Sequence, residues 1–299
     1  SVDRDAWDAS DGTEFVDEWG VSRRAVPSDF GGVNWERVSY PLAHATAADI
    51  DSYRWPDATD PARTEGLAER AKHLWHDTDY AIGARAVSHG LLEIATELRG
   101  MEQFLTDLVL DERFADALLE RIRELLLGLW DAYLEAVGPY AQVVCQGDDV
   151  GMQTGLLLSP QMYRRFIKPV HRAIYARIRQ RTRAKIFMHS CGSIREIIPD
   201  LIEIGVDALN PIQRNAAGMD IFELKREFGR DLCFWGGGID VQRDLPGASL
   251  EEKFGPEPSS YGVEALRKAL EAHQKREREA EKAAETTESA LSNRYCSDR

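Results

Sequence analysis

The sequence has no long apolar run and no excess of basic residues. No stretch of about 18 consecutive apolar residues occurs, so a membrane-spanning helix is not expected. The 51 acidic residues outnumber the 37 basic residues, which gives a formal net charge of -14 at pH 7. A nucleic-acid-binding surface needs a basic face to neutralise phosphates, and an anionic membrane surface attracts the same positive charge. The charge balance therefore argues against both kinds of partner.

Cysteines are few and scattered, and the amino-terminal residues lack a leader pattern. The four cysteines do not have the spacing of a disulfide framework: Cys145, Cys191, Cys233 and Cys296. Reduced thiols are therefore expected. Residues 1–5 are polar and do not begin the charged-then-apolar pattern of a signal peptide. A cytoplasmic location is the resulting expectation.

Motifs of several common enzyme classes are also missing. The sequence contains no G-x-G-x-x-G or G-x-x-x-x-G-K-[ST] loop, no G-x-S-x-G nucleophile elbow and no H-E-x-x-H helix. Residues 236–238 are three consecutive glycines that could bring backbone N–H groups to an anion, but they lack the spacing of a nucleotide-binding loop. Nucleotide binding is therefore not indicated.

The composition is that of a globular protein, and it divides the chain into three regions. Hydrophobic residues make up 43% and charged residues 29% of the 299 residues. Residues 1–78 predict an irregular layer packed on a larger body, because they are rich in tryptophan, glycine and proline but have little to form a core alone. Residues 79–250 are regular and predict a barrel core. Residues 251–299 predict a charged helical or disordered tail, whose apolar stripe fades after Leu270.

Strand and helix patterns alternate through the core region. Apolar stretches predict strands at residues 80–87, 140–145, 185–188, 206–209 and 231–235. Helical patterns lie between them, the strongest over residues 111–137. Pro169 is expected to kink or divide the helix that begins at Ser159, and Ser193 with Glu196 predicts a capping box. This alternation is typical of a parallel α/β sheet.

The positions of polar groups favour a barrel over an open sheet. Chemically capable side chains follow each predicted strand: Ser88 and His89, Asp148 and Asp149, His189 and Cys191, Asn210 and Gln213, and Asp240. An open sheet concentrates its site at one switch point, whereas a barrel collects residues from many strand ends on one face. We therefore expect a (β/α)8 TIM barrel.

An apolar strand ends in His189 and Cys191, directly before Gly192. Side chains at positions i and i+2 of an extended strand project from the same side. Imidazole and thiolate are zinc ligands, but zinc sites normally have three or four ligands, and an H-x-C pair alone is a weak signal. A buried cysteine is often inert packing. The position at the carboxyl end of a strand favours a functional site and leaves the packing alternative open.

Asp148 and Asp149 form an acidic pair after another strand. They could hold a cationic or N–H-bearing substrate, act as acid and base, or supply a metal ligand. A turn or helix-capping pair is an equal alternative, since Gly-Asp-Asp suits a loop. Asn210 and Gln213 could orient a substrate by hydrogen bonds or serve only as turn residues. His171 is expected to be structural.

Taken together, these segments resemble the uroporphyrinogen decarboxylase superfamily. The matching segments are residues 147–153 (GDDVGMQ), 159–169, 189–192 (HSCG), 205–213 (GVDALNPIQ) and 234–240 (FWGGGID). They occur in the order found in the family and look most like its corrinoid-dependent methyltransferase branch, which includes methylcobamide:coenzyme M methyltransferases. The resemblance implies a (β/α)8 barrel.

The resemblance also implies a chemistry. In the methyltransferase branch, zinc is held by a His-x-Cys pair and a later cysteine, and it binds a thiol substrate as the thiolate that attacks a methyl-corrinoid. The ligands carried over are His189 and Cys191. Asp148 and Asp149 are the expected catalytic residues, because one of them matches the acid that binds pyrrole N–H groups in the metal-free decarboxylase branch. The expected substrate-binding residues are Gln153, Asn210, Gln213 and Asp240.

The sequence departs from the family at both ends. Relatives carry the third thiolate on the last strand, in a segment replaced here by the charged tail after about residue 250. Cys296 lies in a polar terminus and is a poor substitute, and Cys233 on a neighbouring strand has no other support. Relatives also have a first strand upstream of residue 1. The barrel is therefore expected to be incomplete at its start and altered at its end, and exposed strand edges favour a homodimer.

Three functions fit the sequence. The preferred one is zinc-dependent methyl transfer from a methyl-corrinoid, free or carried by a corrinoid protein, to a thiol or similar acceptor. The second is uroporphyrinogen decarboxylation in tetrapyrrole biosynthesis, without a metal. The third is a truncated barrel that binds a ligand and has no catalytic activity.

Overall fold

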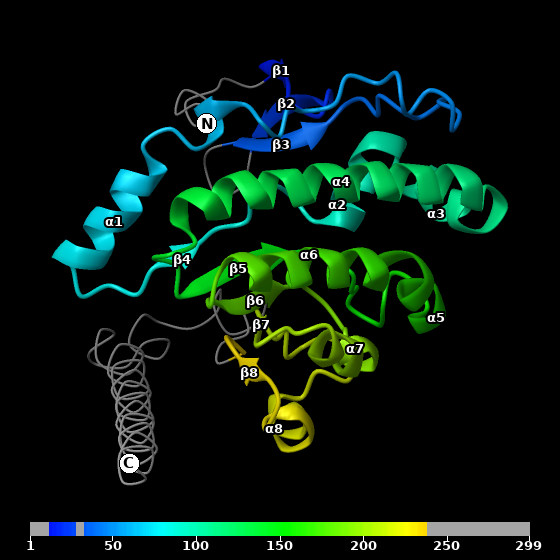
Figure 1. The fold of residues 1–299 in the computed structure, drawn as a ribbon. Helices are drawn as coiled ribbons and strands as arrows, with labels where there is room; N and C mark the ends of the chain where they lie inside the picture. The colour runs from blue at the N-terminus through cyan, green and yellow to red at the C-terminus, as the bar shows by residue number, and fades with distance from the viewer. Residues whose placement is uncertain (1–11, 28–32, 238–299) are drawn as a thin grey trace, which may run out of the picture. The chain divides into compact units, whose positions relative to one another are not determined.

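The computed structural model describes residues 12–27 and 33–237 and contains two β-sheets (Figure 1). The smaller is antiparallel, with its strands in the order β1 (Glu14–Val16), β2 (Ser22–Pro27) and β3 (Val33–Arg37). It lies within residues 1–78, for which the sequence predicts an irregular layer. The predicted boundaries at residues 78 and 250 stay predictions, and residues 251–299 lie outside the described residues.

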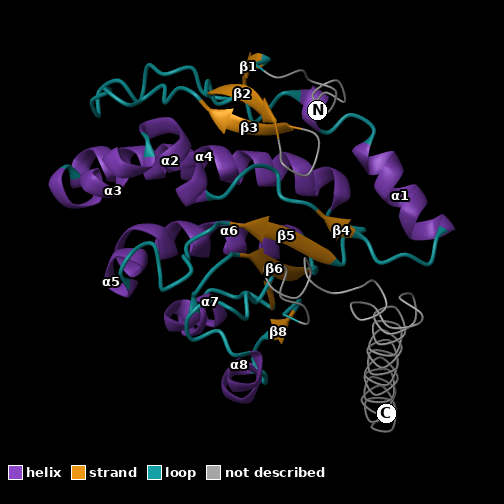
Figure 2. Ribbon diagram, turned by 180° about the vertical axis from the view of Figure 1, so that it is seen from behind, coloured by secondary structure: helices purple, strands orange, loops and turns teal. Residues whose placement is uncertain are grey.

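The larger sheet has five parallel strands (Figure 2). In spatial order they are β4 (Gly83–Ala84), β5 (Val143–Gly147), β6 (Lys185–His189), β7 (Ala208–Asn210) and β8 (Cys233–Phe234). The spatial order follows the sequence order throughout, whereas a doubly wound sheet reverses direction at a switch point. This is the order of successive strands in a (β/α)8 barrel, which has eight. The described residues therefore form part of such a barrel, as predicted, although the strands are mostly shorter than the apolar stretches suggested.

Helices connect the parallel strands. Their bounds are α1 (Leu67–Asp77), α2 (Leu91–Arg99), α3 (Met101–Leu110), α4 (Glu112–Val137), α5 (Pro160–Met162), α6 (Lys168–Arg181), α7 (Ile198–Glu203) and α8 (Ile221–Phe228). Helix α1 precedes β4, helices α2 to α4 lie between β4 and β5, and each later connection contains at least one helix. Helices α4 and α6 pack against each other along the sheet (Figure 1).

The two faces of the parallel sheet differ in burial. Alternate strand residues on the outer face are buried in one core with the helices: Ala84, Val144, Gln146, Ile186, Met188 and Leu209. Residues between them point to the inner face, which would line the barrel interior. Apart from the buried Ala208, they are half-buried or exposed: Val143, Cys145, Phe187, His189, Asn210 and Trp235. The strand period of two thus places packing residues on one face and leaves the other accessible.

Helix α4 fulfils its predicted pattern. Asp111 caps its amino end by accepting a hydrogen bond from the backbone N–H of Phe114. The apolar positions at helical spacing, from Phe114 to Leu129, are buried. Near the other end, the indole N–H of Trp130 donates to the side-chain oxygen of Gln146 on β5, so the helix is tied to the outer face of the sheet.

Two local predictions had different outcomes. The helix from Ser159 is divided as expected: a π-helical turn at Tyr163–Ile167 joins α5 to α6, and Pro169 lies in the first turn of α6. The capping box at Ser193 is wrong. The Ser193 hydroxyl donates to the carbonyl oxygen of Ala217 at 2.6 Å, so the neighbouring loop holds it away from the helix that it was expected to cap.

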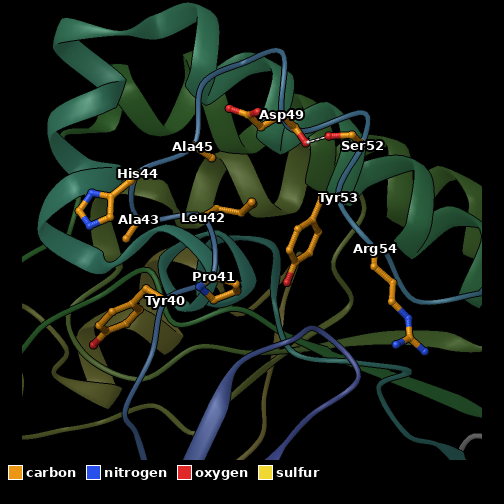
Figure 3. Close-up of a pocket in the computed structure, with 10 residues that line it drawn as sticks. All are labelled: Tyr40, Pro41, Leu42, Ala43, His44, Ala45, Asp49, Ser52, Tyr53 and Arg54. Atoms are coloured by element: carbon orange, nitrogen blue, oxygen red, sulfur yellow. Dashed lines mark hydrogen bonds between the residues drawn. The ribbon is translucent and has the colours of Figure 1, made fainter.

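A buried ion pair anchors the segment before α1. The guanidinium of Arg99 on α2 contacts the Asp107 carboxylate at 2.7 Å, and both side chains are more than nine-tenths buried. Arg99 also donates to the carbonyl oxygens of Leu42, Ala43 and Ala45. These acceptors lie among residues 40–45, which together with Asp49 and residues 52–54 line a surface cavity of about 550 Å³ (Figure 3).

Within residues 12–27 and 33–237, no helix combines the length and apolar character needed to cross a membrane.

Replacing Asp107 by alanine is expected to lower the free energy of unfolding by about 3–5 kcal/mol, because Arg99 loses its counter-charge while staying buried. Urea denaturation measures this change. Glu102→Ala, an exposed substitution on the same helix, serves as the control and should stay within about 0.5 kcal/mol of the unmodified protein. A loss of less than about 1 kcal/mol for Asp107→Ala would contradict the stabilising role of the pair.

Candidate metal-binding site

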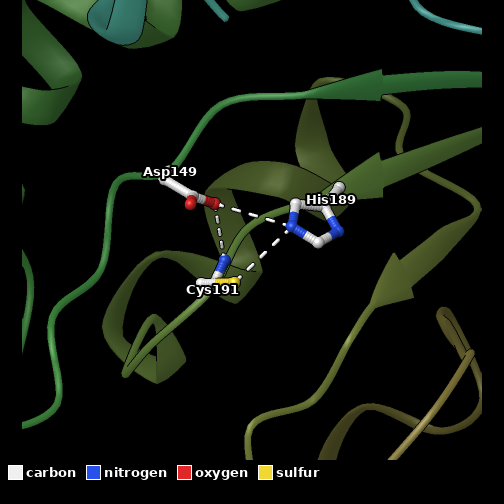
Figure 4. A group of neighbouring side chains, drawn as sticks. All are labelled: Asp149, His189 and Cys191. Atoms are coloured by element: carbon white, nitrogen blue, oxygen red, sulfur yellow. Dashed lines mark hydrogen bonds and ion pairs between the residues drawn. The ribbon is translucent and has the colours of Figure 1, made fainter. Parts of the chain in front are cut away.

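Asp149, His189 and Cys191 converge at the carboxyl ends of β5 and β6 (Figure 4). One ligand atom from each, a carboxylate oxygen, an imidazole nitrogen and the thiol sulfur, lies within 4.8 Å of the other two. His189 Nε2 is 3.5 Å from Cys191 Sγ and 3.8 Å from Asp149 Oδ1. Among the described residues, no other group of three or more His, Cys, Asp or Glu side chains converges closely enough to hold a metal ion.

Strand register brings the three residues together. Gly147 on β5 pairs with His189 on β6 in the parallel ladder. Asp149 and Cys191 each follow two residues later, so the backbone carries them to the same level. The backbone N–H of Cys191 donates to Asp149 Oδ1 at 2.8 Å and fixes that carboxylate against the β6 loop.

The two loops approach so closely that glycine is required where they cross. Gly192 has a φ of 82°, which residues with a side chain rarely adopt. A Cβ atom at Gly192 would lie 2.5 Å from the carbonyl carbon of Gly151, and one at Gly151 would lie 2.6 Å from the carbonyl oxygen of Cys191. The glycine of the H-x-C-G motif therefore permits the contact between the loops that carry Asp149 and Cys191.

Asn210 sets the tautomer of His189. The Asn210 amide nitrogen donates to the carbonyl oxygen of Trp235 at 2.8 Å, which turns the amide oxygen toward His189. That oxygen lies 2.7 Å from His189 Nδ1 and accepts its hydrogen. In the neutral imidazole, Nε2, the nitrogen that faces Cys191 and Asp149, is then the one without a hydrogen. An imidazole oriented by a hydrogen bond through its other nitrogen is the usual arrangement of a metal ligand.

The thiol of Cys191 lies in a negative environment. Burial raises the pKa of Cys191, and the charges of Asp149 and Glu93 raise it further. Without a cation, the thiol is therefore held in its protonated form. A divalent cation among these donors would reverse that effect, because a coordinated thiol loses its proton.

Asp148 faces away from this cluster. Its side chain is buried, and its oxygens accept hydrogen bonds from the backbone N–H of Leu92 at 3.0 Å and of Glu93 at 3.3 Å, in the first turn of α2. Oδ2 also lies 2.8 Å from Nε2 of the buried His171. These are the contacts of a helix-capping residue, the alternative that the sequence left open. The catalytic role predicted for Asp148 stays a prediction.

The predicted substrate-binding residues lie beside the cluster and mainly contact the chain itself. Gln213 accepts a hydrogen bond from the backbone N–H of Gly192 at 2.9 Å and donates to Gln153 at 2.7 Å. Gln153 in turn donates to the carbonyl oxygen of Asn215 at 2.6 Å. The network joins the loops after β5, β6 and β7. Asp240 lies outside the described residues, and so does Cys296.

The third donor was not identified from the sequence. The sequence predicts a catalytic role for Asp149, and a metal ligand is one of the roles that it leaves open for the acidic pair. Asp149 lies two residues after the end of β5, and Cys191 lies two residues after the end of β6. This equal spacing is the sequence signal that could have identified Asp149 as the third donor. Cys233, the other candidate, is exposed on β8 and is not part of the cluster.

The donor set fits a zinc ion. Zinc accepts carboxylate oxygen, imidazole nitrogen and thiolate sulfur, and catalytic zinc sites use three protein ligands and keep a fourth position open. The neutral donor Nε2 faces two groups that can be anionic, Asp149 and Cys191, whose charges a divalent ion would balance. Asp149 and His189 are each about two-fifths exposed, so a small molecule can reach the cluster.

A comparison with solved structures matches a methyltransferase from Methanosarcina mazei, at 18% sequence identity and a TM-score of 0.48. That match covers 73% of this chain and 60% of the methyltransferase, so the chain spans about three-fifths of its length. A mutant morphinone reductase in complex with tetrahydroNAD matches at 16% identity and a TM-score of 0.27, over 80% of this chain and 68% of the reductase.

No curated protein matches the sequence. The family described as "Uroporphyrinogen decarboxylase (URO-D)" matches residues 32–237, which is more than half of the chain and includes the cluster of Asp149, His189 and Cys191 and the five parallel strands of the described residues. The order of the strands and the H-x-C-G segment at the end of β6 agree with the resemblance found from the sequence. The chain therefore belongs to the uroporphyrinogen decarboxylase (URO-D) family.

Proposed function

We propose that this protein is a zinc-dependent methyltransferase that transfers a methyl group from a methyl-corrinoid to a thiol. The observation that carries the proposal is the convergence of Asp149, His189 and Cys191 within 4.8 Å. The three side chains supply the oxygen, nitrogen and sulfur donors of a three-ligand zinc site. Asp149 supplies the third donor, for which the sequence offered only Cys233 and Cys296.

Each residue of the site has a distinct task in this proposal. His189 presents Nε2 because Asn210 holds the hydrogen on Nδ1. Asp149 is held in place by the backbone N–H of Cys191. A zinc ion bound there would lower the pKa of a thiol substrate, so that the thiolate nucleophile is present at neutral pH. Methyl transfer from a bound methyl-corrinoid would form the sulfur–carbon bond as the cobalt–carbon bond breaks, with the bonding electron pair left on the cobalt.

The decarboxylase alternative has less support from the geometry. It requires an accessible carboxylate to bind pyrrole N–H groups. Asp148 is buried and uses its oxygens to cap α2. Asp149 is accessible but lies against Cys191 and His189, where a metal ligand set explains all three residues together.

Metal content tests the ligand set. The purified, reduced protein is expected to contain about one zinc per chain, and Asp149→Ala, His189→Ala and Cys191→Ala should each lose most of it, because three ligands hold the ion. Elemental analysis measures this. Cys233→Ala removes a thiol outside the cluster and should keep full zinc. Zinc-free wild-type protein, or equal loss in Cys233→Ala and Cys191→Ala, would contradict the proposal.

Asn210→Ala is expected to weaken zinc binding by about 10–100-fold while leaving the three ligands intact, because the His189 imidazole loses the partner that orients it. Competition with a chromophoric chelator measures the dissociation constant. Asn34→Ala, at an exposed asparagine on β3, is the matched control. An unchanged dissociation constant in Asn210→Ala would show that the hydrogen bond to His189 does not prepare the ligand.

Zinc affinity is expected to rise with pH. Burial and the neighbouring carboxylates raise the pKa of Cys191 in the metal-free protein, so the thiol is protonated there and must release its proton when zinc binds. The association constant should therefore increase about tenfold per pH unit between about pH 7 and pH 8.5. Chelator competition at several pH values measures the slope. A pH-independent affinity over this range would mean that Cys191 does not bind as a thiolate.

A further inference from the structure

Two aromatic side chains lie together on the inner face of the parallel sheet. Phe187 on β6 and Trp235, directly after β8, have their ring centroids 5.2 Å apart at an interplanar angle of 83°. Trp235 is 46% exposed, and Phe187 is half-buried. Cys145, the β5 residue paired with Phe187 in the ladder, is half-buried as well. This accessible apolar surface is separate from the buried core on the outer face.

The aromatic pair adjoins the metal-binding cluster. Phe187 precedes His189 by two residues on the same strand, so their side chains leave the same face roughly 7 Å apart. Asn210 connects the two features, since it bonds the His189 imidazole through its oxygen and the Trp235 carbonyl through its nitrogen. A molecule bound at the cluster through sulfur can therefore extend over the rings of Phe187 and Trp235.

Charge around the cluster favours an uncharged substituent on that molecule. Asp149 and Glu93 both act on the Cys191 thiol as negative charges, and they would repel an anionic group nearby. On the inner face, Lys185 lies at the opposite end of β6 and is 3.7 Å from Asp207. Arg85, beyond the short strand β4, is the cation whose charge reaches Cys145. Because Arg85 is a positive charge on this side of the sheet, an anionic thiol is the alternative ligand with which apolar thiols are compared below.

We propose that Phe187 and Trp235 form a subsite for the aromatic or bulky apolar substituent of the thiol acceptor. The inference rests on the proposed function and adds the class of substrate. The edge-to-face arrangement of the rings leaves the exposed part of Trp235 free to pack against a further ring, and such contacts are favourable beyond simple burial of area. The metal-binding residues hold the sulfur, and the two rings select what is attached to it.

Binding of thiols to the cobalt(II)-substituted protein tests the subsite without a methyl donor. Cys191 already gives the cobalt site one thiolate absorption band, and a second thiolate from an added thiol changes that band, so the change on titration gives a dissociation constant for each thiol. Benzyl mercaptan is expected to bind about tenfold more tightly than ethanethiol or mercaptoacetate. Trp235→Ala should remove that preference, whereas Trp235→Phe should keep most of it. The hydrogen bond from Asn210 uses the Trp235 backbone, so either substitution can leave the metal site intact.

Trp75→Ala is the matched control. Trp75 is 45% exposed, close to the 46% of Trp235, but it lies on α1 beside Tyr140 rather than on the inner face of the sheet. The preference for benzyl mercaptan should survive in this variant.

The outcomes separate the two proposals. Equal binding of the three thiols, tighter binding of mercaptoacetate, or a preference that Trp235→Ala leaves unchanged would overturn the aromatic subsite and leave the thiol-binding metal site standing. A cobalt-loaded protein whose thiolate band does not change with any of the three thiols would overturn the proposed function, and the subsite with it.

Discussion

The parallel pairing of β5 with β6 is the constraint on which the candidate site depends. The ladder sets Gly147 opposite His189, and both strands end there. From that shared level, two residues of chain bring Asp149 and Cys191 to each other, and the Cys191 N–H closes the contact. A shift of the register by one residue would turn His189 to the buried outer face. The site is therefore a property of the sheet rather than of one loop.

The consecutive acids after β5 take different roles because their side chains continue the alternation of the strand, with Asp148 buried and Asp149 accessible. Asp148 is directed into the protein, where it caps α2 and meets His171. Asp149 is directed to the accessible side, toward Cys191. Gly90 makes the first contact possible, since a Cβ there would lie 2.2 Å from Asp148 Oδ1. One residue thus anchors a helix to the strand end, and the next is available for chemistry.

Much of this could be predicted from the sequence where the signal is local. The alternation of apolar and helical patterns gave the parallel sheet, and the position of His189 and Cys191 at a strand end indicated a site there. What could not be predicted depends on contacts between distant segments. The capping box at Ser193 failed because Ser193 bonds to Ala217. Asp148 and Asp149 look equivalent in the sequence, and they can be distinguished only when it is known which of them α2 covers. Phe187 contacts Trp235 only because β6, β7 and β8 are neighbours in the sheet.

The central claim is that one carboxylate, one imidazole and one thiolate bind a single zinc ion. X-ray absorption at the zinc edge of the reduced, purified protein measures the ligand set directly. The account predicts one sulfur neighbour per zinc at about 2.3 Å, with the remaining neighbours nitrogen or oxygen at about 2.0–2.2 Å. Two or more sulfur neighbours would show that another cysteine replaces Asp149, and the absence of sulfur would remove Cys191 from the site.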